Sequence, residues 1–167
     1  ASGPCLRIYI SKKDSKYKIS KKFINQLNYE IKWGIFNNKT YNLFRKKVEN
    51  HKIKFLSLIK KLNNNKNSIG CFSAPAKGNT LLNYMKISNK IIKYVSENNK
   101  RKIGKLTPGT HYKIINDNDF LSKKISYSIL LSWNYKKFFL ENSKYSKKGN
   151  YFIVPMPNPH IIKKNEK

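Results

Sequence analysis

Cysteine is rare in this sequence, and long apolar runs are missing from it. Only Cys5 and Cys71 occur among its 167 residues, too few for a disulfide framework or a four-thiolate zinc site, so no metal site is predicted. Each thiol is flanked by apolar residues, and we expect both to be reduced, buried and inert. No run reaches the roughly 18 apolar residues of a membrane span. Residues 1–5 also lack the basic end and apolar run of a secretory signal, so a cytoplasmic protein is expected.

Acidic residues and arginine are scarce as well. Eight Asp and Glu stand against 36 Lys and Arg, which gives a net charge of +28. Such a charge attracts anions, and non-specific, salt-sensitive binding to nucleic acid is expected. Only three of the basic residues are arginine, the better side chain for bidentate contacts to phosphates and bases. A dedicated nucleic-acid-binding role is therefore the less favoured interpretation.

Residues 1–66 are predicted to form a leading strand and two helices packed on the rest of the domain. Residues 6–10 alternate and are rich in β-formers, which predicts the strand. Helical spacing of apolar residues predicts a helix over 19–31, ended by Gly34, and a second from about Thr40, a plausible N-cap, to Leu62. His51 lies within the apolar stripe of the second helix, and we interpret it as a satisfied, half-buried histidine rather than a ligand.

Residues 67–167 alternate strand-like and helix-like patterns. Strands are predicted at 68–72, 91–96, 127–131 and 151–154, and helices at 79–87, around Asp119 and at 135–145. This alternation implies right-handed crossovers and a mostly parallel sheet. The predicted fold is α/β and Rossmann-like, with helices on both faces of the sheet and one compact domain overall.

In such a sheet, ligands bind on the loops at the carboxyl ends of the strands. The loop over 73–80 is a strand-to-helix turn, where free backbone N–H groups and the helix dipole favour an anion. Its candidate substrate-binding residues are Ser73, Lys77, Asn79 and Thr80. Neither a P-loop nor the Gly-x-Gly-x-x-Gly fingerprint is present, so a tight turn capped by Asn79 is the alternative.

Two further loops carry candidate binding residues. An acid at the end of a second strand, here Glu97, is where α/β nucleotide folds often hold a ribose hydroxyl. After another strand, Trp133 can stack on a base or sugar, and the neighbouring amide can read a polar edge. A solvated charged loop and a core tryptophan are the alternative interpretations. The candidates from these two loops are Glu97, Lys102, Gly109, Thr110, Trp133 and Asn134.

Taken in order along the chain, these segments resemble the C-terminal domain of sugar C-methyltransferases. These S-adenosylmethionine-dependent enzymes methylate a carbon of a nucleotide-linked keto-deoxysugar. The resemblance spans nearly the whole chain, and the 11-residue block over 74–84 is its most specific part. The matching motifs are Leu6-Arg7-x-Tyr9, Ala74-Pro75-Ala76-Lys77-Gly78-Asn79-Thr80-Leu81-Leu82-Asn83-Tyr84, Lys102-x-Gly104, Thr107-Pro108-Gly109-Thr110, Leu131-x-Trp133-Asn134 and Phe152-Ile153-Val154-Pro155-x-Pro157.

The resemblance implies that this chain helps to hold the nucleotide-sugar, with Lys77 and Asn79 near its phosphates or sugar. Family members also have a cysteine-rich zinc segment and a methyl-donor domain, and this sequence contains neither. We therefore expect S-adenosylmethionine to bind the full enzyme rather than this chain alone, and zinc to bind only the other segment. A domain that binds S-adenosylmethionine is the expected partner, in cis or in trans, and the chain alone is expected to be inactive.

The sequence departs from the family pattern at its start. Ser2-Gly3-Pro4-Cys5 stands where the family has His-Gly-Gly-Ser, whose His is the proposed base that removes a proton beside the keto group. An unactivated serine is no base near neutrality, so no catalytic residue is assigned to this chain. Glu97 also replaces an Asp of the family. A catalytically degenerate sugar-nucleotide-binding module is the first alternative function, and a basic nucleic-acid-binding protein is the second.

Overall fold

The computed structural model describes residues 5–63 and 68–164, and it divides the chain into two compact units, 1–49 and 50–167. Three of the residues that stand in place of the family's His-Gly-Gly-Ser, and most of the polar run after Leu62, lie outside the described residues. Within the described ranges, no helix is long and apolar enough to cross a membrane. The expectation that residues 1–66 pack on the rest of the chain stays a prediction.

The first unit contains the predicted first helix. Helix α1 spans Lys21–Trp33: the Ser20 hydroxyl accepts a hydrogen bond from the Phe23 N–H, and Gly34 ends the helix at φ 92°. A left-handed residue at a helix end is readily supplied by glycine, which has no Cβ. None of the side chains of α1 is buried.

The strand predicted at residues 6–10 is wrong. These residues have no regular secondary structure and are exposed, with Ile10 at 91%. Alternating β-formers give a strand its side-chain pattern, but a lone strand leaves its N–H and C=O groups without partners. No ladder within the described part of the chain pairs this segment.

Helix α2 spans Asn38–Leu62 and crosses the boundary between the two units. It starts two residues before the predicted N-cap Thr40, because the Asn37 side chain accepts the Lys39 N–H at 2.9 Å. In the second unit its stripe is buried at Phe55, Ile59 and Leu62. The prediction for His51 is confirmed: its Nε2 lies 2.6 Å from the Pro155 carbonyl oxygen and its ring stacks on Phe55.

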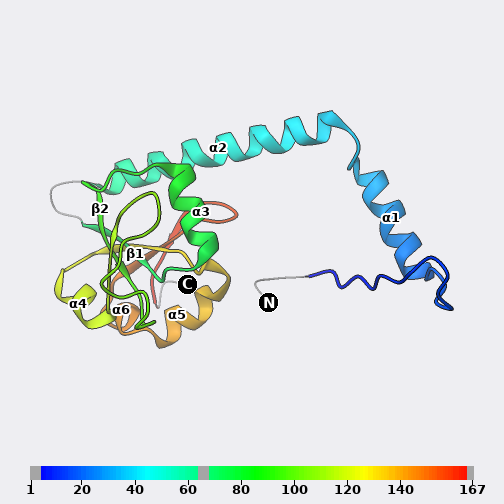
Figure 1. Cartoon of the computed structure of the whole chain (residues 1–167). Coiled ribbons are helices and arrows are strands. Elements are labelled where there is room, and N and C mark those ends of the chain that lie inside the picture. The colour runs from blue at the N-terminus through cyan, green and yellow to red at the C-terminus, as the bar shows by residue number, and fades with distance from the viewer. Residues whose placement is uncertain (1–4, 64–67, 165–167) are drawn as a thin grey trace. The chain divides into compact units, whose positions relative to one another are not determined.

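The second unit is built on a six-stranded sheet (Figure 1). The strand order is β3-β2-β1-β4-β5-β6, with every pair parallel except the antiparallel pair β5 and β6. The predicted mostly parallel α/β fold is confirmed, although the short β3 and β6 were not predicted. The strands are β1 (Ile69–Phe72), β2 (Ile92–Ser96), β3 (Lys113–Ile115), β4 (Tyr127–Leu130), β5 (Tyr151–Val154) and β6 (His160–Ile162).

The helices of this unit differ from the predicted ones at their ends. Helix α3 begins three residues early, at Ala76, because Pro75 takes the N-cap position and its fixed φ suits a helix start. The single helix predicted at 135–145 is broken at Ser143, whose hydroxyl caps the next helix by accepting the Ser146 N–H. The elements are α3 (Ala76–Met85), α4 (Asp117–Ser122), the 3₁₀ turn η1 (Trp133–Tyr135), α5 (Lys136–Asn142) and α6 (Lys144–Lys147).

Two hydrophobic clusters cover the two faces of the sheet, because successive strand residues point to opposite sides. Cys71 and Ile129 join the cluster that contains side chains of α2 and α3. Phe72 and Leu130, the next residues along the same strands, join a cluster with side chains from α4 and α6. The predicted layering, with helices on both faces, is thereby confirmed. Of the two thiols expected to be buried, Cys71 is buried, whereas Cys5 is exposed.

Candidate functional site

The sheet order changes direction between β1 and β4. From β1 the chain adds β2 and β3 on one side, and then β4, β5 and β6 on the other. In open α/β sheets the crevice at the carboxyl ends of the two strands flanking this reversal is the usual place for a ligand. The loops that follow β1 and β4 are therefore the centre of the candidate site.

A hydroxyl pair joins these two loops. Ser73 follows β1 and Ser132 follows the end of β4, and their Oγ atoms lie 2.8 Å apart. Ser73 has φ 65°, in the left-handed region that is unfavourable for a residue with a side chain. Ser73 was a candidate from the sequence but Ser132 was not, because nothing in the sequence aligns the ends of two non-consecutive strands.

The ammonium group of Lys77 lies in the first turn of α3, against the loop after β4. Its Nζ is 4.3 Å from the centre of the Trp133 ring, is covered, and has no hydrogen-bond partner within the described residues. Burial lowers the pKa of Lys77 because it removes water from the charged form. The structure thus brings together Lys77 and Trp133, which are 56 positions apart in the sequence.

A second buried polar atom lies in the same turn. Asn79 does not cap α3, as one interpretation of the sequence had it: its own N–H donates to the Pro75 carbonyl, inside the helix. The Asn79 Oδ1 is covered and lacks a hydrogen-bond partner in the described structure. The Lys77 ammonium and the Asn79 Oδ1 thus both lack a hydrogen-bond partner in the described structure, and both lie in the first turn of a helix. A ligand with both anionic and hydroxyl groups would suit them.

Close packing places this turn against β4. A Cβ on Gly78 would lie 2.7 Å from the Leu131 Cβ and 3.2 Å from the Pro75 Cγ. Only glycine permits α3 to approach Leu131 this closely. Thr80 lies one turn further along α3 and is exposed. Asn134 lies in η1, next to Trp133, and is also exposed.

Glu97 and Lys102 belong to the same edge of the sheet but are engaged with the chain itself. The Ala74 N–H donates to Glu97 Oε2 at 3.0 Å, and Lys102 Nζ donates to the Ala74 carbonyl at 2.8 Å. The two side chains also form an ion pair, with 3.5 Å between Lys102 Nζ and Glu97 Oε2. The predicted candidates thus lie beside the β1–α3 turn.

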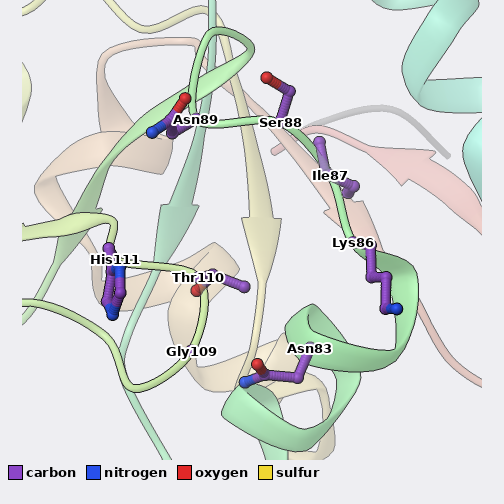
Figure 2. A pocket seen from close by; sticks show the side chains of 8 residues that line it. All are labelled: Asn83, Lys86, Ile87, Ser88, Asn89, Gly109, Thr110 and His111. Carbon is purple, nitrogen blue, oxygen red and sulfur yellow. The ribbon is translucent and has the colours of Figure 1, made fainter.

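Gly109 and Thr110 are not brought to this place. They line an open pocket of about 450 Å³ together with Asn83, Lys86 and His111 (Figure 2). Gly109 lies against Asn83, whose Oδ1 would be 2.0 Å from a Cβ at that position. Their turn is joined to α3, because Asn83 Nδ2 donates to the carbonyl oxygens of both Asn79 and Pro108 at 2.9 Å.

A polar cluster that was not predicted from the sequence lies at the carboxyl ends of β2 and β3. Asp117 accepts hydrogen bonds from the Ser96 hydroxyl and, at 2.9 Å, from the Asn98 side chain. Asp117 follows β3, a strand of only three residues in a polar stretch. Had that strand been predicted, the acid two residues after its end would have been a candidate. Within the described residues, no group of three His, Cys, Asp or Glu side chains is placed to hold a metal ion.

The sheet order defines the class of protein: a Rossmann-like α/β domain, in which the carboxyl edge at the reversal of the strand order is the usual position for a ligand. Residues 1–157 match the family described as the C-methyltransferase C-terminal domain. The chain belongs to that family, and the resemblance found in its motifs is confirmed.

The chain is also similar to a longer curated protein. The chain is similar to the C-methyltransferase NovU of Streptomyces niveus, with 25% identity over 161 residues. The alignment covers 96% of this chain and 38% of the relative. This chain therefore spans less than half the length of the curated protein it matches.

Proposed function

We propose that this chain is the nucleotide-sugar-binding part of a C-methyltransferase that depends on S-adenosylmethionine. The observation that carries the proposal is the buried Lys77 ammonium at the start of α3, next to the reversal of the sheet order, which has no hydrogen-bond partner among the described residues. A diphosphate would supply the negative charge that this ammonium lacks, and it would meet the N–H groups of the first turn of α3.

The remaining site residues suit the sugar and the base. The uncompensated Asn79 Oδ1 can accept a hydrogen bond from a sugar hydroxyl. The Trp133 ring, now covered on one face by the Lys77 ammonium, offers an aromatic surface for a base or sugar. Binding would move the ammonium from the ring to the phosphates, so both groups would change partners together.

The proposal places the methyl donor on another domain. The β1–α3 turn lacks the Gly-x-Gly-x-x-Gly fingerprint, and the carboxylate of Glu97 is held by backbone amides of the chain. In the proposed enzyme the donor supplies an electrophilic methyl group, and another domain binds it. This chain would hold and orient the keto-sugar. The carbon beside the ketone would lose its proton to a base not assigned to this chain, and the enolate would take the methyl group from the donor sulfur, which would leave as a neutral thioether.

Two functions of this chain are compatible with the proposed site. The first is a domain that completes an active enzyme with a donor-binding partner. The second is a degenerate binding module, favoured by Ser2-Gly3-Pro4-Cys5 in place of His-Gly-Gly-Ser. Adding a donor-binding domain separates them, since only the first then transfers a methyl group.

The test is calorimetric titration of the chain with dTDP-, UDP-, GDP- and CDP-linked sugars at moderate salt. We expect saturable binding of one of them, and a loss of roughly tenfold or more in affinity with Lys77→Met, the scale of a charge-assisted contact. Lys46→Met removes the same charge from an exposed position of α2 and serves as the matched control.

Single-stranded RNA tests the other candidate function, which the net charge of +28 favours. Binding to RNA alone, fading steeply as salt increases and equal for the two Lys variants, would make the chain a basic nucleic-acid-binding protein. Equal affinity of Lys77→Met and the unchanged chain for the sugar nucleotide would show that the site lies elsewhere.

A further inference from the structure

Both backbone polar groups of Ala74 are bound by side chains from the loop after β2. Its N–H donates to Glu97 Oε2 at 3.0 Å, and its carbonyl oxygen accepts from Lys102 Nζ at 2.8 Å. Because the two side chains also pair with each other, they close a ring of contacts around one residue of the β1–α3 turn.

The second carboxylate oxygen of Glu97 is occupied as well. Oε1 accepts the N–H groups of Asn98 at 2.9 Å and Asn99 at 3.1 Å. The Glu97 side chain is only 14% exposed, whereas that of Lys102 is 42% exposed. Both oxygens of this acid therefore bind amides of the chain itself.

The residue they hold connects two constrained neighbours. Ser73, which precedes Ala74, has a positive φ. Pro75, which follows Ala74, is the N-cap of α3, and its side chain makes no capping hydrogen bond. Since a serine in the left-handed region is unfavourable on its own, contacts around it must keep it there. The contacts to Ala74 fix the path of the turn, and with it the position at which α3 and Lys77 begin.

We propose that Glu97 and Lys102 are positioning residues that clamp the Ala74 peptide groups and so place Lys77, and that Glu97 does not bind a ribose hydroxyl. This inference rests on the proposed function. In dinucleotide-binding folds, the acid at the end of the second strand uses its oxygens for the ribose. Here a ribose could reach them only by displacing backbone N–H groups, which are costly to leave unpaired.

The experiment tests whether the loss of affinity on removing a ribose hydroxyl depends on the Glu97 side chain. Calorimetry measures the affinity of the chain for the sugar nucleotide it binds and for the analogues that lack the 2′- or 3′-hydroxyl, before and after Glu97→Gln. A positioning role predicts that Glu97→Gln weakens every ligand by a similar factor, roughly tenfold. The factor by which affinity falls when a ribose hydroxyl is removed should then be the same for the unchanged chain and for Glu97→Gln.

The same affinities are measured for Lys102→Met and for the control variant Glu141→Gln. Lys102→Met should weaken binding in the same ligand-independent way, and adding it to Glu97→Gln should weaken binding by less than the product of the two single effects. Glu141→Gln removes the same charge from an exposed position on α5 and should leave affinity unchanged. If Glu97→Gln does not fold, Lys102→Met, at the more exposed partner, carries the test.

The results that overturn the inference are distinct from failure of the proposed function. A hydroxyl effect that disappears in Glu97→Gln would mean that Glu97 binds ribose, while the nucleotide-sugar site itself would stand. If no sugar nucleotide binds the unchanged chain, the proposed function is wrong, and hydrogen exchange tests the clamp alone. Exchange of the Ala74 amide should then be at least roughly tenfold faster in Glu97→Gln, and an unchanged rate would reject the clamp.

Discussion

Residues 5–49 and residues 50–167 carry apolar side chains at similar spacing but bury them very differently. Phe44 and Phe55 lie on the same stripe of α2, three turns apart, yet Phe44 is 63% exposed and Phe55 is fully buried. The difference is that the sheet of the second unit faces Phe55, through the cluster with Cys71, Leu82 and Ile129. Spacing therefore predicts a helix in both regions, but only a second packed layer makes its stripe a core.

The two thiols give the largest expected contrast between the regions. Cys5 is exposed and Cys71 is buried, and burial raises the pKa of Cys71 because its thiolate would be desolvated. Alkylation of native protein should modify Cys5 at least about a thousandfold faster than Cys71, which becomes accessible only on unfolding. Mass spectrometry after brief iodoacetamide treatment measures both sites. In denaturant the two thiols should react alike, and rapid native labelling of Cys71 would contradict the buried assignment.

Alanine at the two phenylalanines of α2 should separate the regions in stability. Phe55→Ala is expected to lower the free energy of unfolding by about 3–5 kcal/mol, because it leaves a cavity in a closed core. Phe44→Ala should change it by no more than about 0.5 kcal/mol, the range of surface substitutions. Urea unfolding of the full chain measures both. Equal losses would mean that Phe44 is covered to the same degree as Phe55.

Within the second region, the closeness of α3 to β4 can be tested at one glycine. Gly78→Ala places a Cβ 2.7 Å from the Leu131 Cβ, and overpacking of this kind should lower the free energy of unfolding by about 1–3 kcal/mol. Thr80→Ala in the same helix, at an exposed position, is the matched control and should have little effect. A Gly78→Ala protein as stable as the control would show that α3 has room to move away from the sheet.

The pH dependence of stability should report the covered Lys77 ammonium, the smallest of these effects. Its pKa is lower in the folded chain than in the unfolded chain, so between the two values the unfolded chain binds more protons. The free energy of unfolding should therefore increase as pH rises through that window, and Lys77→Met should remove this part of the increase. Lys46→Met, at an exposed site in the first region, should not. Parallel curves for the unchanged chain and Lys77→Met would contradict the desolvation of Lys77.

Much of the fold follows from local patterns that the sequence displays directly. The helices α1 and α2, and the strands β1, β2, β4 and β5, have the predicted periodicity and begin and end within about two residues of the predicted bounds. The short β3 and β6 do not, since three residues carry too little pattern and their pairing with β2 and β5 makes them strands. The converse error was at residues 6–10, where the alternating pattern is present but none of the described strands pairs with the segment.

The candidate site was predictable in its parts but not in its assembly. The small, polar turn after β1 was recognisable because glycine, proline and a lysine stand between a strand and a helix. Its contact with the loop after β4, through Ser73 and Ser132, depends on β1 and β4 being neighbours in the sheet. Chain order alone placed Gly109 and Thr110 with the other candidates, whereas the structure packs their loop against α3 at Asn83.

The sequence by itself determined the alternation of strands and helices, the family and the polar turn at the start of α3, because these depend on residues near one another in the chain. Only the tertiary structure decided which acid forms hydrogen bonds to the chain itself and which cation lacks a hydrogen-bond partner in the described structure. Glu97 and Lys102 are held by the Ala74 peptide groups, while Lys77 lies on Trp133 without a hydrogen-bond partner in the described structure. Charge and burial at a site are set by neighbours from distant segments, and the packing of the sheet is what brings those segments together.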